Sequence, residues 1–270
     1  MALLAVLEFD LRSLALLQTA LGVDHQLVTC ACWTQLQEVV RNQAVEGCIL
    51  DIYGASEPVT LRELQQLRRR QPPVAIVVHA DFKGREMDLF ELGRLDVDGV
   101  ILAEQEEDHR AIRDTVRQAM GTVVALRVRQ ALQGRIPVAG LDCLAWAVEH
   151  ATGAPTVDHL AGAFGLTRRT LARELRERDL PAPSEFLLWG RLFRAVHVLD
   201  APGRTVEAAA FAVGYSSGAA LGRAFRRETG YPPTETVRRG GAAVVLQAFL
   251  KACGSGAVGR RSDRSRGPGS

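Results

Sequence analysis

TVDHLAGAFGLTRRTLARELRER, residues 156–178, is the stretch that decides the fold of the C-terminal half of this chain. It consists of a capping Thr, a short apolar helix, a glycine, a second capping Thr and a second helix. Residues 205–228, TVEAAAFAVGYSSGAALGRAFRRE, repeat the pattern 49 residues later. Two helices joined by a tight glycine turn are typical of a helix-turn-helix, so the sequence predicts two such units in tandem.

Capping residues and turn glycines can be assigned in both units. In the first unit, Thr156 and Thr167 are expected to cap the two helices. Between them, Gly165 is expected to adopt the left-handed conformation that ends the first helix. The corresponding residues of the second unit are Thr205, Ser216 or Ser217, and Gly214.

The second helix of each unit is the candidate reading helix, and it separates an apolar stripe from a polar face. The apolar stripes, spaced four residues apart, are Leu171 with Leu175 and Leu221 with Phe225. The polar face of the first reading helix carries Arg169, Arg173 and Arg176, which can reach phosphates or the guanine edge in a major groove. The aligned positions of the second reading helix are Ala219, Arg223 and Arg226.

The segment from about Leu141 to Arg238 resembles the DNA-binding domain of the AraC/XylS family of bacterial transcription regulators. The similar residues are Leu160-Ala161, Leu171, Arg173, Arg191-Leu192, Ala195, Leu199, VGYSS at 213–217, Leu221, Arg223, Phe225 and TGYPP at 229–233. The resemblance implies seven helices, with the two units entering successive major grooves of duplex DNA. The chain departs from the family at Leu175, where Phe is usual, and at the small residues Ala208, Ala209 and Ala219.

The resemblance also implies which residues contact DNA. The base-reading positions are Arg169, Ala172 and Arg173 in the first unit, and Gly218, Ala219, Ala220 and Arg223 in the second. Their neighbours Arg168 and Ser217 complete the predicted contact set. Because Gly and Ala offer only shape and contact with thymine methyls, the first reading helix is predicted to be the principal reader.

Charge is divided unevenly along the chain. Residues 1–120 contain 12 Lys and Arg against 19 Asp and Glu, a net charge of −7, whereas residues 121–270 contain 21 against 12, or +9. The basic part contains both helix-turn-helix units, as a polyanionic partner requires. Double-stranded DNA is therefore the expected partner.

The first 120 residues alternate between apolar runs and amphipathic stretches. The apolar runs are LLAVLE, QLVTCACW, GCILDI, VAIVVH and GVIL. The amphipathic stretches lie near 11–22, 34–44, 59–70, 84–93 and 107–119. This alternation predicts a doubly wound, flavodoxin-like α/β domain with strand order 2-1-3-4-5. Any site should lie at the carboxyl ends of its first, third and fourth strands.

GCILDIYG places Asp51 at the end of the third strand, where it resembles the phosphoacceptor of CheY-like receiver domains. Such a domain also needs two acidic residues after the first strand, a Thr or Ser after the fourth and a Lys after the fifth. Those places contain Glu8-Phe9, with Asp10 next, then His79 and Ala103. We therefore predict a degenerate receiver that binds no metal through Glu8 or Asp51 and is not controlled by phosphorylation.

Four segments are expected. Residues 1–120 form the receiver-like domain, 121–139 a connector, 140–240 the DNA-binding domain, and 241–270 a C-terminal helix with a disordered basic tail from Gly254. A homodimer could form through the receiver-like domain, at the acidic run of Glu104, Glu106, Glu107 and Asp108 with Arg110 and Arg113.

The rest of the sequence excludes several classes of protein. Five cysteines form no secreted-type framework, and neither a signal peptide nor a membrane span is found, so a cytoplasmic location is expected. The sequence contains no paired nucleophile and base, no glycine-rich phosphate loop and no metal-ligand spacing. Neither an enzyme nor a cofactor is therefore expected.

The sequence predicts a sequence-specific bacterial transcription regulator, with RNA polymerase or another protein as a further partner. Two alternatives stay open. One is a phosphorylation-dependent response regulator that uses Asp51. The other is a protein-interaction module whose helical half has lost DNA reading, so that its arginines form only a solvated face.

Overall fold

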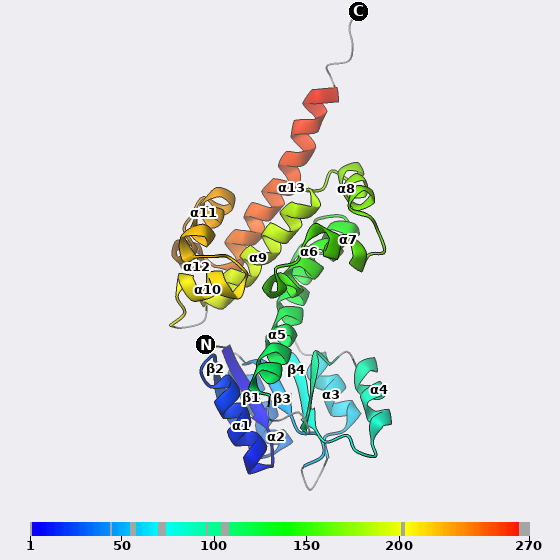
Figure 1. Cartoon of the computed structure of the whole chain (residues 1–270), viewed down its shortest axis with the longest axis vertical. Helices are drawn as coiled ribbons and strands as arrows, with labels where there is room; N and C mark the ends of the chain where they lie inside the picture. Colours follow the sequence, from blue (N-terminus) through cyan, green and yellow to red (C-terminus); the bar gives the residue numbers. More distant parts are fainter. Residues whose placement is uncertain are drawn as a thin grey trace, which may run out of the picture. The chain divides into compact units, whose positions relative to one another are not determined.

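The computed structural model describes residues 2–43, 45–54, 58–69, 74–95, 97–103, 108–200 and 203–264. The chain forms two compact units, Met1–Val123 and Val124–Ser270. The boundary between them falls inside helix α5 (His109–Leu132). Figure 1 identifies the elements of each unit.

The first unit is built on a parallel five-stranded sheet. Its strands are β1 (Ala2–Leu7), β2 (His25–Cys30), β3 (Val45–Leu50), β4 (Ala75–Ala80) and β5 (Gly99–Leu102). The strand order is β2-β1-β3-β4-β5, as predicted. Every residue of β4 is buried, which explains why this strand is a continuous apolar run rather than an alternating one.

Helices cover both faces of this sheet. They are α1 (Leu11–Leu21), α2 (Trp33–Asn42), α3 (Leu61–Arg68), α4 (Glu86–Arg94) and the first part of α5. One core contains Leu36, Leu64 and Leu92 from α2, α3 and α4, and the other contains Leu17 and Ile112 from α1 and α5. The predicted doubly wound α/β fold is confirmed.

The second unit is helical. Its elements are the rest of α5, α6 (Val138–Glu149), the 3-10 turn η2 (Ala151–Gly153), α7 (Val157–Ala163), α8 (Arg168–Glu177), α9 (Pro183–Asp200), α10 (Val206–Ala212), α11 (Gly218–Thr229), α12 (Pro233–Arg238) and α13 (Ala242–Arg264). Both helix-turn-helix units pack against α9, which connects them in sequence.

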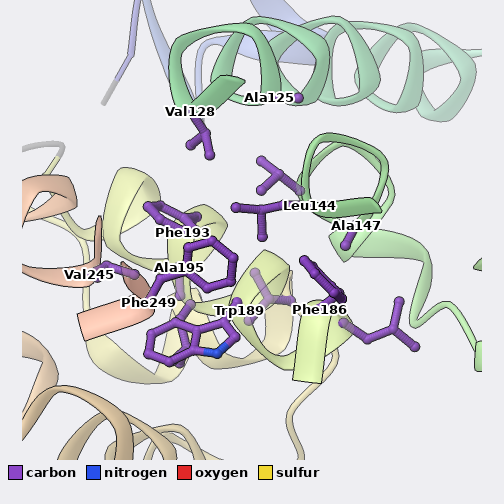
Figure 2. Packing of buried hydrophobic residues seen from close by; sticks show 14 of the residues in the cluster. Ala125, Val128, Leu144, Ala147, Phe186, Trp189, Phe193, Ala195, Val245 and Phe249 are labelled. Atoms are coloured by element: carbon purple, nitrogen blue, oxygen red, sulfur yellow. The ribbon is translucent and has the colours of Figure 1, made fainter. Parts of the chain in front are cut away.

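Helix α9 forms the centre of this core. Figure 2 shows its Phe186, Trp189 and Phe193 gathered with residues of α5, α6 and α13. At its crossing with α6, a methyl group on Gly190 would lie 2.4 Å from the Ala147 carbonyl oxygen, so only glycine permits this approach. Close helix contact at this point fixes the frame that carries both units.

The core extends past the predicted limits of 140–240. Val124, Val128 and Leu132 of α5 are buried in it, although the sequence assigned residues 121–139 to a connector. Phe249 of α13 is also fully buried in it. We propose that the DNA-binding domain includes the second half of α5 and α13.

Other predictions fall partly beyond the described residues. Disorder was expected from Gly254, yet α13 continues through Arg264, and residues 265–270 lie outside the described part of the chain. The acidic residues Glu104, Glu106 and Glu107 also lie outside it, so the homodimer stays a prediction. Among the described residues, no helix has the length and apolar character needed to cross a bilayer.

Candidate nucleic-acid interface and strand-end pocket

The first helix-turn-helix unit has the caps that the sequence predicts. Thr156 Oγ1 accepts a hydrogen bond from the His159 amide at the start of α7, and Thr167 Oγ1 accepts one from the Thr170 amide at the start of α8. Gly165 between them has a φ of 67°, in the left-handed region. These local contacts fix both ends of the turn before any tertiary packing is considered.

The second unit repeats this construction. Thr205 Oγ1 accepts from the Ala208 amide at 3.1 Å, and Gly214 has a φ of 76°. The sequence left Ser216 and Ser217 as alternative caps of the second helix. The cap is Ser217, whose Oγ accepts from the Ala220 amide at 3.2 Å.

The reading helices bury the predicted stripes and turn the predicted arginines outward. The stripe residues Leu171, Leu175, Leu221 and Phe225 are all buried. The predicted contact residues that are exposed are Arg168, Arg169, Ala172 and Arg173 on α8, and Ala219 and Arg223 on α11. Ser217 and Ala220 are half-buried, and Gly218 is buried. The reading helix of the first helix-turn-helix unit, α8, therefore presents more polar side chains to solvent than α11 does.

A carboxylate near the start of the first helix binds the start of the reading helix in both units. In the first unit, Asp158 binds the Arg168 guanidinium, with Arg168 Nη2 2.5 Å from Asp158 Oδ2. In the second, Glu207 Oε2 accepts from the Gly218 amide at 2.7 Å. The sequence analysis missed this pair, although an acid follows Thr-Val in both copies.

The glycine at 218 leaves room for the Glu207 carboxylate at this contact. A methyl group there would lie 2.5 Å from Glu207 Oε2 and 3.3 Å from the Glu207 amide nitrogen. Arg168 occupies the equivalent place in α8 and binds Asp158 through its side chain instead. Both residues thus fix the reading helix against the helix before it.

The arginines of the reading helices differ in their partners. Arg173 lies 3.8 Å from Glu177, an exposed pair one turn apart that contributes little to stability. Within the described part of the chain, neither Arg169 nor Arg223 forms an ion pair. Their guanidinium groups can therefore bind a polyanion without first giving up an internal carboxylate.

A cavity of about 680 Å³ opens at the carboxyl ends of the strands in the N-terminal compact unit, Met1–Val123. Its lining includes every residue that the receiver comparison selected except Phe9: Glu8, Asp10, Asp51, His79 and Ala103. Phe9 is half-buried and packs against the apolar core of α2, α3 and α4. The cavity therefore lies at the strand ends where the sequence predicted that any site should be, and its chemistry depends on the contacts within it.

Glu8 and His79 form a buried pair in this cavity. His79 Nδ1 lies 2.6 Å from Glu8 Oε2, and the two residues are 2% and 7% exposed, respectively. The other oxygen of Glu8 accepts hydrogen bonds from the amides of Phe9 and Asp10, each at 3.0 Å. Both carboxylate oxygens of Glu8 therefore bind groups of the protein.

Asp51 is held by its own loop. Its Oδ1 accepts from the amides of Tyr53 at 2.9 Å and Gly54 at 3.0 Å. Burial raises the pKa of Asp51 above its ordinary value, and the negative charge of Glu8 acts in the same direction. A methyl group on Gly54 would lie 1.9 Å from Asp51 Oδ2, so this approach also needs glycine.

Two cations in the cavity were missed by the sequence analysis. Lys83 and Arg85 follow β4, whereas the expected lysine was sought after β5, where Ala103 stands. Arg85 lies over the Tyr53 ring, 4.1 Å from its centroid, and the Tyr53 hydroxyl donates to Asp88 at 2.5 Å. The only sequence signal was the segment DFKGR directly after the fourth strand.

Among the described residues, no group of three or more His, Cys, Asp and Glu side chains is placed to hold a metal ion. Asp10 instead caps α1 by accepting from the Ser13 amide at 2.8 Å, and this hydrogen bond lowers the pKa of Asp10.

Comparison with known proteins identifies relatives of the helix-turn-helix segment in the C-terminal compact unit. Residues 160–239 match the family described as "Helix-turn-helix domain". The "HTH-type transcriptional activator RhaS" of Escherichia fergusonii is 34% identical over 123 residues, which cover 45% of this chain and 44% of that protein. The chain therefore spans less than half the length of the curated relatives it matches. These matches confirm the helix-turn-helix prediction.

Two solved structures are each similar to part of the chain. A DNA-binding transcriptional dual regulator from Escherichia coli K-12 has 23% identity and a TM-score of 0.35, covering 38% of this chain and 92% of that one. The N-terminal signal receiver domain of a response regulator from Bacteroides fragilis has 15% identity and a TM-score of 0.39, covering 44% and 97%.

Proposed function

We propose that the AraC-type helix-turn-helix domain of this chain reads duplex DNA, and that the whole chain is a sequence-specific transcription regulator. The observation that carries the proposal is the outward presentation of Arg169, Arg173 and Arg223 by two capped reading helices. An ordinary helical domain has no need of two such frames in tandem. The basic charge of this half supports a polyanionic partner.

The two helix-turn-helix units contribute differently to DNA binding. Arg169 and Arg173 on α8 can each bind a guanine through two hydrogen bonds, while α11 offers Arg223 beside the small residues Ala219 and Ala220. Arg168 serves to position α8, because its guanidinium already binds Asp158. The first unit is thus the main source of base-specific affinity.

Selection of duplexes from a random library by the full chain tests this function. The selected duplex should lose affinity steeply with added salt, since arginines displace condensed counterions. Substituting Ala for both Arg169 and Arg173 should weaken specific binding at least about 30-fold, because each bidentate contact to guanine is worth roughly 1–3 kcal/mol. Arg223→Ala should cost less.

The matched control is a double substitution of Arg62 and Arg94 by Ala, two exposed arginines of the N-terminal compact unit. It removes the same charge and should leave specific affinity nearly unchanged. If the Arg169 and Arg173 double variant selects the same site with wild-type affinity, α8 is not the principal reader.

The receiver-like domain acts as an input domain without aspartyl phosphate. Support comes from Glu8, whose two oxygens bind His79 and the backbone of its own loop rather than remaining available to a divalent cation. His79 also replaces the hydroxyl side chain that would contact a phosphoryl group, and Ala103 supplies no ammonium.

A phosphorylation-dependent response regulator is the second candidate function. One observation favours it: Lys83 and Arg85 line the same cavity as Asp51 and could supply the positive charge that Ala103 lacks. The paired Glu8 weighs against it, because phosphoryl transfer to an aspartate in such a site depends on a bound metal ion.

A further inference from the structure

The turn of the second helix-turn-helix unit contains a half-buried aromatic residue, Tyr215. Its amide donates to the Ala210 carbonyl at 2.9 Å, which closes the end of α10. The equivalent residue of the first unit is Leu166, whose amide donates to the Ala161 carbonyl at 3.0 Å. The two turns therefore share this backbone hydrogen bond and differ in the side chain that follows the glycine.

Tyr215 is in contact with a cation of α9. The Arg191 guanidinium carbon lies 5.9 Å from the centroid of the Tyr215 ring, within the range of a cation–π contact. Arg191 Nε is buried and has no hydrogen-bond partner among the described residues. The ring face is therefore a contact that offsets the loss of water around this charge.

The environment of Tyr215 also includes the reading helix. Burial raises the pKa of the Tyr215 hydroxyl, whereas the positive charges of Arg191 and Arg227 lower it, Glu228 raises it, and a side-chain hydrogen bond with Arg191 lowers it. Arg227 and Glu228 belong to α11 and lie 2.6 Å apart. Tyr215 is thus placed where both α9 and α11 act on it.

The first helix-turn-helix unit lacks this cation–π contact. Leu166 and Tyr215 both pack as partly buried residues against the apolar cluster of the C-terminal compact unit, but Leu166 has no ring to lie beside a guanidinium. Apolar contact of this kind has no preferred direction, whereas a guanidinium over a ring face has one. The orientation of α11 relative to α9 consequently depends on a directional contact that the first unit does not use.

We propose that Arg191 is a positioning residue that sets the orientation of the second reading helix, and so determines the half-site spacing that the chain accepts in DNA. This inference rests on the proposed function. Because α9 connects the two units, a change at its contact with the second turn moves α11 while leaving α8 in place. Arg191 then affects specificity without contacting a base.

The test uses the full chain and the duplex recovered by selection from random DNA. Hydroxyl-radical footprinting locates the two protected half-sites of the wild type, and duplexes with one base pair added or removed between them measure the spacing preference. Arg191→Met should lower affinity about fivefold, the equivalent of roughly 1 kcal/mol. It should also lose protection of one half-site only and discriminate less between spacings.

Three further variants make the outcome specific. Tyr215→Phe keeps the ring and removes only the hydroxyl contact with Arg191, so it should keep the wild-type spacing preference, while Tyr215→Leu copies the first helix-turn-helix unit and should behave like Arg191→Met. Arg239→Met removes a guanidinium that lies 4.4 Å from the centroid of another ring, Tyr231, away from the second turn, and should leave the spacing preference unchanged. If Arg191→Met does not fold, judged by circular dichroism, Tyr215→Leu decides.

The possible results separate this inference from the proposed function. Full protection of both half-sites by Arg191→Met and Tyr215→Leu, with wild-type spacing preference, would overturn the positioning role and leave DNA reading intact. A wild type that protects only one half-site would overturn it too. A wild type that protects no sequence would remove the proposed function and this inference together.

Discussion

At the scale of single residues, function depends on a few close contacts between polar atoms. Glu207 lies against the start of α11, and the carboxylate of Glu8 lies against His79. In each case the carboxylate binds a group of the protein itself. Substitution of the residue that it contacts is therefore expected to have a cost. Both contacts lead to substitutions with a predicted direction.

The first prediction concerns the glycines of α11. Gly218→Ala should destabilise the C-terminal compact unit by about 1–3 kcal/mol, because the new methyl group crowds both the Glu207 side chain and its backbone. Gly222→Ala on the same helix is the matched control, since nothing lies within 4 Å of the added carbon. It should stabilise by about 0.5–1 kcal/mol.

Urea unfolding followed by tryptophan fluorescence measures both changes. A Trp33→Phe background is useful, because of the 3 tryptophans only Trp146 and Trp189 then report, and both lie in the second unit. Shifts of the unfolding midpoint in the same direction for both glycine variants would contradict the role given to Gly218.

The second prediction concerns Asp51. Incubation with magnesium and a small-molecule phosphodonor should leave the intact mass unchanged, because Glu8 is bound by His79 and its own loop. Asp51→Asn should leave DNA affinity largely intact. A mass gain of one phosphate that disappears in Asp51→Asn would instead establish an ordinary response regulator, and Lys83→Met would then test the source of positive charge.

At the scale of elements, α13 is part of the core of the C-terminal compact unit. The ring of Phe249 makes edge contacts with Phe186, Trp189 and Phe193 of α9, at centroid distances of 6.0, 5.6 and 6.4 Å. Aromatic pairs at these distances and angles add to the free energy of burial. The helix that carries both readers is therefore stabilised by a residue outside the matched segment 160–239.

The third prediction follows from that packing. Phe249→Ala should destabilise the second unit by about 3–5 kcal/mol, the usual cost of removing a buried Phe side chain. Lys251→Ala, an exposed position of the same helix, should change the free energy of unfolding by less than about 0.5 kcal/mol. The same urea experiment in the Trp33→Phe background separates them, and equal midpoints would show that α13 does not support the core.

At the scale of the whole molecule, the chain consists of two units with separate cores. The sheet of the first unit has apolar clusters on both faces, and the aromatic cluster around α9 belongs to the second. The net charges of the two parts have opposite signs, −7 for residues 1–120 and +9 for the rest. Such a division suits an input domain joined to a domain that binds a polyanion.

Local sequence features were sufficient for the frame of the molecule. Thr156, Thr167 and Thr205 cap helices as predicted, because a cap is a hydrogen bond to an amide three residues along the chain. Gly165 and Gly214 are left-handed for equally local reasons. Apolar runs and their spacing predicted the alternating α/β fold, and the strand order expected for a flavodoxin-like fold is confirmed.

The chemistry within the sites was decided by tertiary structure. Glu8 and His79 are 71 residues apart, and Lys83 reaches the Asp51 cavity from a loop where no lysine was sought. Arg191 meets Tyr215 only because α9 packs against the second unit. The sequence by itself determined caps, turns, strands and the duplicated readers, since these depend on neighbours along the chain. Which charges are paired, buried or available depends on residues far apart in sequence, and only folding brings these together.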